Sequence, residues 1–135
     1  MKRSCTPYIV KEFLKEHPYY KNVDIKFYID NNNYEEIAIV LLENRNRKKL
    51  DMILNAIFSG NYLDEVYGNE NVGKNVSIKA MKFKNLNERI YCKEINAGGK
   101  KIVMLMAYYK KSQKITKKLK NKIEIINEYE YEFED

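Results

Sequence analysis

Histidine and cysteine are scarce in this sequence of 135 residues, which contains one histidine, His17, and two cysteines, Cys5 and Cys92. Two cysteines are too few for a disulfide framework. Neither has a second cysteine or a histidine at metal-ligand spacing, which excludes a structural zinc site. A catalytic triad or a Cys-His pair would have to be built on His17 alone, at an expected helix end. The acidic residues show no two-metal cluster, and Gly98-Gly99 joins two expected strands and not a strand and a helix, as a phosphate-binding loop would. We therefore expect no metal and no cofactor.

Long hydrophobic runs are also missing. The longest are residues 37–42 and 102–109, whereas a membrane-spanning helix needs roughly 18 apolar residues. Lys11, Glu12 and Lys15 interrupt any signal-peptide core behind the basic first residues. One domain is expected over residues 1–135, because chains divide at roughly 100 to 200 residues per folding unit. We expect it to be cytoplasmic, with no membrane partner.

Acidic residues are missing from one long stretch and basic residues from another. Residues 100–122 contain nine lysines and no acid, whereas residues 123–135 contain six acids and no base. The net charge of +6 therefore combines a strongly basic body with an acidic C-terminal end. Lysine at this density on a small domain is typical of a site for a polyanion. A solvated helix face, or a general bias towards Lys, Asn, Ile and Tyr, would give the same composition.

The first half of the chain predicts a helix, a strand and a pair of helices. Residues 1–20 form an N-terminal helical extension in this interpretation, because Thr6 and a following proline resemble a helix start and apolar residues then recur at helical spacing. Residues 23–29 alternate between apolar and polar side chains, as in a half-buried strand. From Asn33 to Gly60 two apolar faces separated by a polar segment predict an antiparallel helical hairpin.

The second half predicts three neighbouring strands and a helix. The strands are residues 76–83, with a bulge near Ala80, residues 89–94 and a central strand at 102–109. A hairpin turn at 97–99 joins the last two strands, and the helix covers residues 115–126. The expected fold is therefore α+β. Its antiparallel sheet, mixed at the edge, has about four strands, with the helical hairpin on one face and a C-terminal helix.

Basic and aromatic residues gather on one face of this expected sheet. If the helical hairpin covers Ile90 and Cys92, the opposite face presents Arg89, Tyr91 and Lys93. The neighbouring strand adds Lys79, Lys82 and Lys84. Arginine binds phosphate bidentately and tyrosine stacks on unpaired bases, so the set suits single-stranded RNA or DNA better than a duplex. A hydrated sheet face that happens to be basic is the simpler alternative.

Several segments together resemble the C-terminal half of the RelE/HigB-like toxins, including phage-derived Gp49-like members. They are Asn87–Glu94 (NERIYCKE), Gly99–Lys100, the apolar run 102–106 and Tyr109–Lys114 (YKKSQK). In that family a strand of the RIYCKE type leads through a glycine turn to an apolar strand and an exit of the KKSQK type. The expected order of elements also matches, so the resemblance covers about residues 23–129 and implies a RelE-like fold.

The resemblance implies the toxin of a type II toxin-antitoxin pair, an endoribonuclease that cleaves mRNA, often on the ribosome. Such enzymes use no metal, and the 2′-hydroxyl beside the scissile phosphate is the nucleophile. The expected partners are mRNA, the ribosome and a cognate antitoxin, which we expect to be a small helix-turn-helix protein. Catalysis must align the attacking oxygen and offset negative charge on the phosphorane-like transition state.

The resemblance also implies roles for individual residues. By position Arg89 matches the phosphate-binding arginine of the family, with Lys82 and Lys84 as further cationic contacts. One of these lysines could act as general base or acid. Tyr91 or Tyr109 would stack on or orient a base. The remaining expected RNA contacts are Lys79, Lys93, Lys110, Lys111, Gln113 and Lys114.

Two other classes of function stay open at this point. One is a non-catalytic module that binds single-stranded RNA, and the other is a phage-type protein whose basic strip binds an acidic protein partner. The acidic end, residues 123–135, alternates glutamate with aromatic residues in a strand-like pattern. It could pair with a sheet edge, fold back over the basic surface, or be a frayed solvated terminus.

Overall fold

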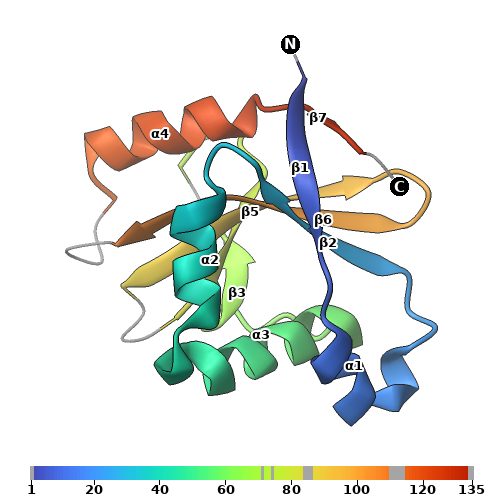
Figure 1. Ribbon diagram of the computed structural model, residues 1–135. Coiled ribbons are helices and arrows are strands. Elements are labelled where there is room, and N and C mark those ends of the chain that lie inside the picture. The colour runs from blue at the N-terminus through green and yellow to red at the C-terminus, as the bar shows by residue number, and fades with distance from the viewer. Residues whose placement is uncertain (1, 71, 74, 84–86, 110–114, 134–135) are drawn as a thin grey trace.

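The computed structural model describes residues 2–70, 72–73, 75–83, 87–109 and 115–133. They form one mixed sheet in the order β3-β4-β5-β6-β2-β1-β7, with helices on both of its faces (Figure 1). The strands are β1 (Arg3–Tyr8), β2 (Ile25–Asp30), β3 (Tyr67–Asn69), β4 (Ile78–Lys82), β5 (Glu88–Asn96), β6 (Lys100–Tyr109) and β7 (Tyr131–Glu132). The helices are α1 (Lys11–Glu16), α2 (Tyr34–Leu42), α3 (Arg47–Ser59) and α4 (Lys117–Asn127), with 3-10 turns at Pro18–Tyr20 and Asn44–Asn46.

The chain is α+β, but the expectation of about four strands was wrong, because the sheet has seven. Strands β3 to β6 are antiparallel neighbours, β2 then pairs with β6 in parallel, and β7 pairs with β1 in parallel. The additional strands are β1, β3 and β7. Strands β3 and β7 are short and lie at the two edges of the sheet, and β1 lies inside the sheet but has no buried residue, so none of the three shows a clear periodic pattern.

The N-terminal segment is part of the sheet and not only a helical extension. Thr6 and Pro7, which resemble a helix start, pair with Ile29 and Tyr28 of β2. The helix begins later, at Lys11, and is only six residues long. The helical spacing of apolar residues in this region therefore belongs to α1 and the two residues before it. Strand β1 has no recognisable strand pattern.

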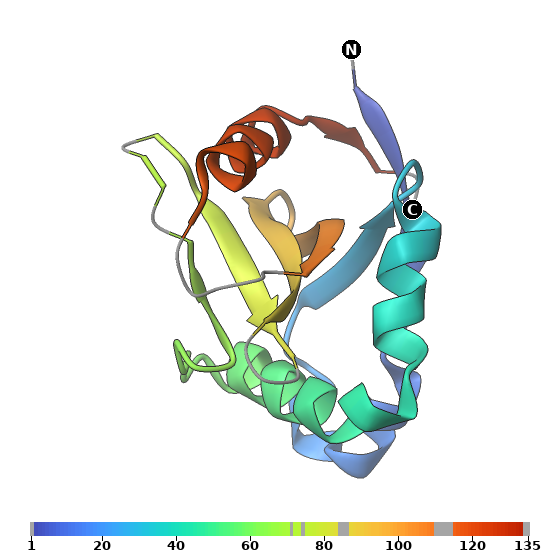
Figure 2. The ribbon, with the colours of Figure 1, turned by 90° about the vertical axis from the view of Figure 1, so that its left-hand side faces the viewer.

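Both faces of the sheet are covered (Figure 2). One face packs against α1, α2 and α3, and its core includes Ile90, Cys92, Ile102 and Met104 of the central strands. The other face packs against α4, and its core includes Tyr91, Val103, Leu105, Leu119 and Ile123. When a strand is buried on both faces, its odd- and even-numbered side chains are both covered. The side chains of the central strands that were expected to bind RNA therefore lie on one covered face or the other.

Burial on both faces explains why no bulge occurs near Ala80. Ala80 belongs to the core under α4, and its neighbour Met81 belongs to the opposite core, so the alternation along β4 is regular. The irregularity lies instead between β5 and β6, where Tyr91 is opposite Met106 but Cys92 is opposite Met104. One extra residue of β6 is accommodated there.

Helices α2 and α3 run in crossing directions and do not form the expected antiparallel hairpin (Figures 1 and 2). Asn46, which is buried at the junction, fixes the corner. Its side-chain amide donates hydrogen bonds to the carbonyl of Val40 (2.8 Å) and to Glu88 Oε1 (2.9 Å). Helix α3 ends at Gly60, whose φ of +75° is the left-handed conformation common after helices.

The elements nearest the expected site follow the sequence closely. β6 lies at the centre of the sheet and is buried along most of its length, and β5 and β6 are joined by the expected turn, with Gly98 and Gly99 at positive φ. Helix α4 starts behind Thr116, whose hydroxyl accepts a hydrogen bond from the Leu119 amide (3.1 Å). No helix in the described ranges is long and apolar enough to cross a membrane.

The C-terminal segment returns to the N-terminal strand. Arg3 and Ser4 of β1 pair with Tyr131 and Glu132 of β7, so the strand-like pattern of this segment is confirmed for these residues. Tyr131 is buried and belongs to the core under α4. The described residues of this segment, up to Phe133, are therefore part of the packed domain and not a frayed end.

Candidate functional site

Arg89 and Tyr91 share one face of β5, opposite Ile90 and Cys92, as predicted. The expectation that this face is exposed was wrong, because α4 and the C-terminal segment cover it. Arg89 retains 4% of its accessible surface and Tyr91 none. No local pattern in the sequence places the last helix over the strand that carries the functional residues.

Arg89 forms a buried ion pair with Glu70. Its Nη1 lies 3.6 Å from Glu70 Oε2, and the two side chains are 4% and 9% exposed. Among the described residues, Arg89 Nε, Arg89 Nη1 and Glu70 Oε2 find no hydrogen-bond partner. Buried charges are normally paired and hydrogen-bonded at once, because taking them out of water is costly. The charges of Arg89 and Glu70 therefore balance, but the N–H groups at Nε and Nη1 of Arg89 still have no hydrogen-bond acceptor in the described part of the chain.

Tyr91 adds a third donor beside this pair. Its hydroxyl is buried and also has no hydrogen-bond partner among the described residues. Burial raises the pKa of Tyr91 well above its ordinary value, and the negative charge of Glu70 raises it further. The hydroxyl therefore keeps its proton near neutral pH and acts as a hydrogen-bond donor.

Three further residues are linked to Arg89 by strand pairing or through Tyr108. Tyr108 of β6 is its direct cross-strand neighbour, and the Tyr108 ring lies 6.5 Å from that of Tyr91. On the other side, Lys82 of β4 is opposite Arg89 and donates a hydrogen bond to the carbonyl of Asp64. Lys122 of α4 places its ammonium 5.6 Å from the centre of the Tyr108 ring. We call the group Arg89, Glu70, Tyr91, Tyr108, Lys82 and Lys122 the Arg89 cluster.

The first half of α4 carries four exposed lysines: Lys117, Lys118, Lys120 and Lys122. Cations at a helix N-terminus oppose the helix dipole, at a cost of about 0.3 to 1 kcal/mol each. Like charges three or four residues apart, such as Lys118 and Lys122, add to that cost. No acid lies in the first turn to offset it. A bound polyanion would relieve this repulsion.

Two of the expected RNA contacts, Lys93 and Lys79, lie apart from the Arg89 cluster. Lys93 donates hydrogen bonds to the carbonyls of Asn127 and Tyr129 (both 2.9 Å), and so holds the end of α4. Lys79 lies on the opposite face, where it donates to Asn69 Oδ1 (2.9 Å). Tyr109 is 64% exposed at the end of β6 and has the opposite parity to Tyr108.

Five expected contacts lie outside the described residues: Lys84, Lys110, Lys111, Gln113 and Lys114. Conversely, the sequence interpretation missed Glu70, Tyr108 and Lys122. Glu70 follows a strand of three residues in a segment interpreted as a loop, and no periodicity marks it. Tyr108 was hidden because the irregularity between β5 and β6 decides which of two adjacent tyrosines faces Arg89.

Within the described ranges, no three His, Cys, Asp or Glu side chains come together in an arrangement that could hold a metal ion. No family model, curated protein or solved structure matches the chain. Function is therefore indicated by the local chemistry of the Arg89 cluster, the lysines of α4 and the resemblance of the sequence segments described above.

Proposed function

We propose that the chain is a metal-independent endoribonuclease that cleaves mRNA, and that it acts as the toxin of a toxin-antitoxin pair. The observation that carries the proposal is Arg89, a buried arginine whose Nε and Nη1 have no hydrogen-bond partner among the described residues. Its cross-strand neighbour Tyr108 lies 5.6 Å from the ammonium of Lys122 in the lysine-rich α4. The resemblance of Asn87–Glu94 and Tyr109–Lys114 to RelE/HigB-like toxins supports the same reaction. The ribosome and an antitoxin are the partners that this proposal implies.

The cluster offers the donors that the reaction requires. In the proposed step the 2′-oxygen bonds to the neighbouring phosphorus while the bond from phosphorus to the 5′-oxygen breaks, which leaves a 2′,3′-cyclic phosphate and a free 5′-hydroxyl. One water takes the proton of the 2′-hydroxyl and another protonates the leaving 5′-oxygen, and negative charge grows on the two non-bridging oxygens during the exchange. Arg89 would donate to them through Nε and Nη1, and protonated Tyr91 would donate a third hydrogen bond. Because these donors are already desolvated and fixed in the core, little reorganisation is needed when the charge develops.

RNA can reach Arg89 only if the carboxylate of Glu70 moves away from the guanidinium. Glu70 directly follows β3, a strand of three residues at the sheet edge, and short edge segments open at little cost in free energy. The exposed lysines of α4 would attract the phosphate backbone first. One phosphate would then replace the carboxylate of Glu70 beside Arg89, exchanging one anion for another.

The second candidate is a module that binds single-stranded RNA without cleaving it. The observation that favours it is the position of Lys117, Lys118 and Lys120, which are exposed and would bind phosphate even if Arg89 stayed covered. The two candidates share the binding surface and differ only in whether a phosphate reaches Arg89.

A cleavage assay with translating ribosomes tests the proposal. The wild type should produce discrete mRNA cuts, whereas Arg89→Lys should reduce them strongly because lysine cannot bind a phosphate bidentately. The double variant Arg89→Gln/Glu70→Gln removes both buried charges together and should also be inactive. Arg47→Gln, at an exposed arginine of α3, removes the same charge elsewhere and should cleave normally.

The same assay separates the candidates. RNA binding without cuts by the wild type would favour the non-catalytic module. Undiminished cuts by a folded Arg89→Lys variant, judged by its melting temperature, would remove Arg89 from the reaction.

A further inference from the structure

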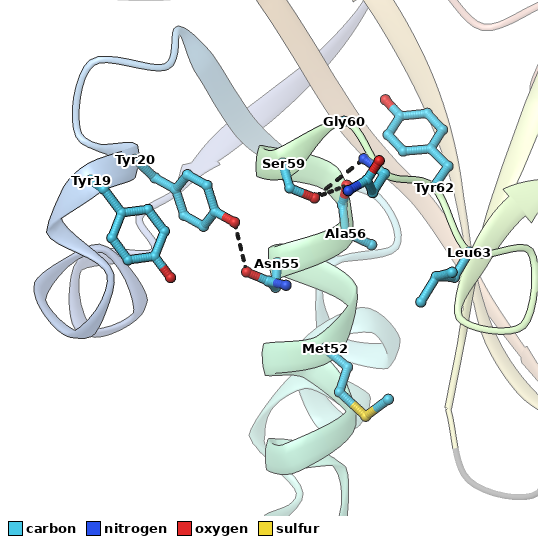
Figure 3. A pocket seen from close by; sticks show the side chains of 10 residues that line it. Tyr19, Tyr20, Met52, Asn55, Ala56, Ser59, Gly60, Tyr62 and Leu63 are labelled. Carbon is cyan, nitrogen blue, oxygen red and sulfur yellow. Dashed lines mark hydrogen bonds between the residues drawn. The ribbon is translucent and has the colours of Figure 1, made fainter.

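An open groove crosses the outer face of α3, away from α4. Its volume is about 1020 Å³. Tyr19 and Tyr20 of the 3-10 turn form one wall, Tyr62 and Leu63 form the other, and Met52 and Asn55 of α3 form the floor (Figure 3). One third of the chain is charged, yet no described residue that lines the groove carries a charge.

The groove combines aromatic rings with amide groups. The Tyr20 hydroxyl donates to Asn55 Oδ1 (2.7 Å), which leaves the amide nitrogen of Asn55 pointing away from Tyr20 (Figure 3). Tyr19 is 69% exposed and packs edge-on against Tyr20, with ring centres 4.5 Å apart. Exposed tyrosines next to an amide suit a flat ligand that stacks and also forms hydrogen bonds at its edge.

Cations flank one wall of the groove. The ammonium groups of Lys79 and Lys100 lie 5.2 and 5.4 Å from the centre of the Tyr62 ring. Lys100 also donates a hydrogen bond to the Tyr62 hydroxyl (2.9 Å). Lys100 is also ion-paired with Glu94, whose Oε1 lies 3.6 Å from the ammonium and whose Oε2 accepts a hydrogen bond from the Tyr62 hydroxyl (3.1 Å), so the net positive charge beside Tyr62 is that of Lys79. A ligand with a neutral planar part and an anionic part would therefore meet both aromatic rings and a net positive charge here. Nucleotides have this composition.

The groove is connected to the Arg89 cluster through one segment of the chain. Asp64, whose carbonyl accepts the hydrogen bond from Lys82, follows directly on Leu63 of the groove wall. Lys82 is in turn the cross-strand neighbour of Arg89. A strand of RNA that leaves Arg89 over Lys82 would round the β3 edge of the sheet, pass the exposed Asp64 and Glu65, and reach Leu63 and Tyr62 on the opposite face.

We propose that this groove is a second subsite for single-stranded RNA, which binds an unpaired base some nucleotides away from the phosphate on Arg89. The inference rests on the proposed function, because it requires RNA at the Arg89 cluster. Tyr19 stacks on the base, Asn55 contacts its edge, and the lysines beside Tyr62 contact the adjoining backbone. The uncharged lining favours the base over the phosphate at this point.

An apolar partner protein would also suit a groove with tyrosine, methionine and leucine. The lysines at Tyr62 and the continuity with Lys82 favour RNA, since an apolar peptide would use neither. The two occupants respond differently to the length of an RNA oligonucleotide, and this difference is the basis of the test.

Binding of unstructured RNA oligonucleotides of two and of about eight nucleotides should be compared for the wild type, Tyr19→Ala and Met52→Glu. The change at Tyr19 should weaken binding of the longer RNA about 5- to 160-fold, the loss of one stacked base, and leave the dinucleotide unaffected. Met52→Glu places a negative charge on the groove floor and should have the same selective effect. Tyr34→Ala, at a tyrosine of α2 that is 42% exposed outside the groove, is the matched control.

Equal affinity of the groove variants and the wild type for the longer RNA would overturn the subsite and leave an apolar protein as the better occupant. Equal loss for both lengths would also overturn it, because the change would then act on the primary site. The proposed function is judged separately by Arg89→Lys: if that variant binds and cleaves RNA like the wild type, the primary site itself is wrong.

Discussion

The hydroxyl of Tyr131 donates a hydrogen bond of 2.6 Å to the carboxylate of Asp30, 101 residues earlier in the chain. Asp30 is fully buried, and Arg3 binds the same carboxylate through Nε (2.7 Å) and Nη2 (3.1 Å). The guanidinium of Arg3 also lies 3.8 Å above the ring of Tyr129. One buried anion therefore joins three strands, β1, β2 and β7.

The first prediction concerns this junction. Tyr131→Phe should lower the free energy of unfolding by about 1.5 to 3 kcal/mol, because a charged buried acceptor loses a donor. Tyr129→Phe keeps the ring beneath Arg3 and should be nearly neutral. Urea unfolding of both variants checks this. Equal stability of Tyr131→Phe and wild type would mean that Arg3 and the backbone amide of Asn33 (3.1 Å) already satisfy Asp30.

The same hydrogen bond has a defined pH dependence. Burial and the bond to Asp30 raise the pKa of Tyr131 far above its ordinary value of 10. The proton is held more tightly in the folded state, so the contribution of Tyr131 to stability is complete below about pH 10 and declines as the pH rises towards the raised pKa. The stability difference between wild type and Tyr131→Phe should therefore shrink above about pH 10.

The second prediction concerns Glu70 as the occupant of the phosphate position. Glu70→Gln should increase RNA affinity, because no carboxylate then competes for Arg89. It should also lower the free energy of unfolding by about 3 kcal/mol, since Arg89 is left buried without a counter-charge. Affinity measurements and thermal melts test both effects, with the exposed Glu65→Gln as control. Lower stability without tighter binding would show that phosphate does not use the place of Glu70.

The third prediction concerns the lysines of α4. Changing Lys117, Lys118 and Lys120 to glutamine should weaken RNA binding for all sequences alike. The slope of log affinity against log salt should become shallower by about 0.7 for each phosphate that the variant no longer neutralises. Three exposed lysines outside α4 and the groove, Lys11, Lys15 and Lys26, provide a control of equal charge. If both triple variants weakened RNA binding equally, the effect would come from net charge and not from the position of the lysines on α4.

The fourth prediction compares the two glycines of the turn between β5 and β6. Gly98 has a φ of +64° and open space around it, so Gly98→Ala should cost only about 1 to 2 kcal/mol of stability. Gly99 has a φ of +105°, and a Cβ there would lie 2.2 Å from Asp24 Oδ2. Gly99→Ala should therefore cost more. The double variant Gly99→Ala/Asp24→Ala should recover the stability lost to the clash with Asp24 but not the stability lost to the positive φ. Equal urea midpoints for Gly98→Ala and Gly99→Ala would contradict this interpretation.

The sequence predicted the central strands and the last helix because each has a strong local pattern. The glycine turn and the apolar run of β6 depend on a few adjacent residues, and α4 buries the residues that its helical spacing indicates. Strand β1 has no such pattern, since its place is set by pairing with β2 and β7. The number of strands could not be read locally for the same reason.

The candidate site was predictable in its residue types but not in its surroundings. The segment around Arg89 indicated an arginine and a tyrosine on one face of a strand, and the structure places them so. Their burial depends on α4, which crosses the sheet, and the ion pair depends on Glu70 from a distant loop. Neither interaction leaves a periodic signal in the sequence, because both are made by the tertiary fold.

The sequence separation of Asp30 and Tyr131 also means that their hydrogen bond can form only late in translation. At about 5 to 20 residues per second, a ribosome needs about 5 to 20 s to add the 101 residues between them. During that interval the emerging chain holds an acid destined for the interior and a strand, β1, whose edge has no β7 to cover it. An uncovered edge can pair with other chains. Nascent chains stalled before Tyr131 should therefore be the species most prone to aggregate or to engage chaperones.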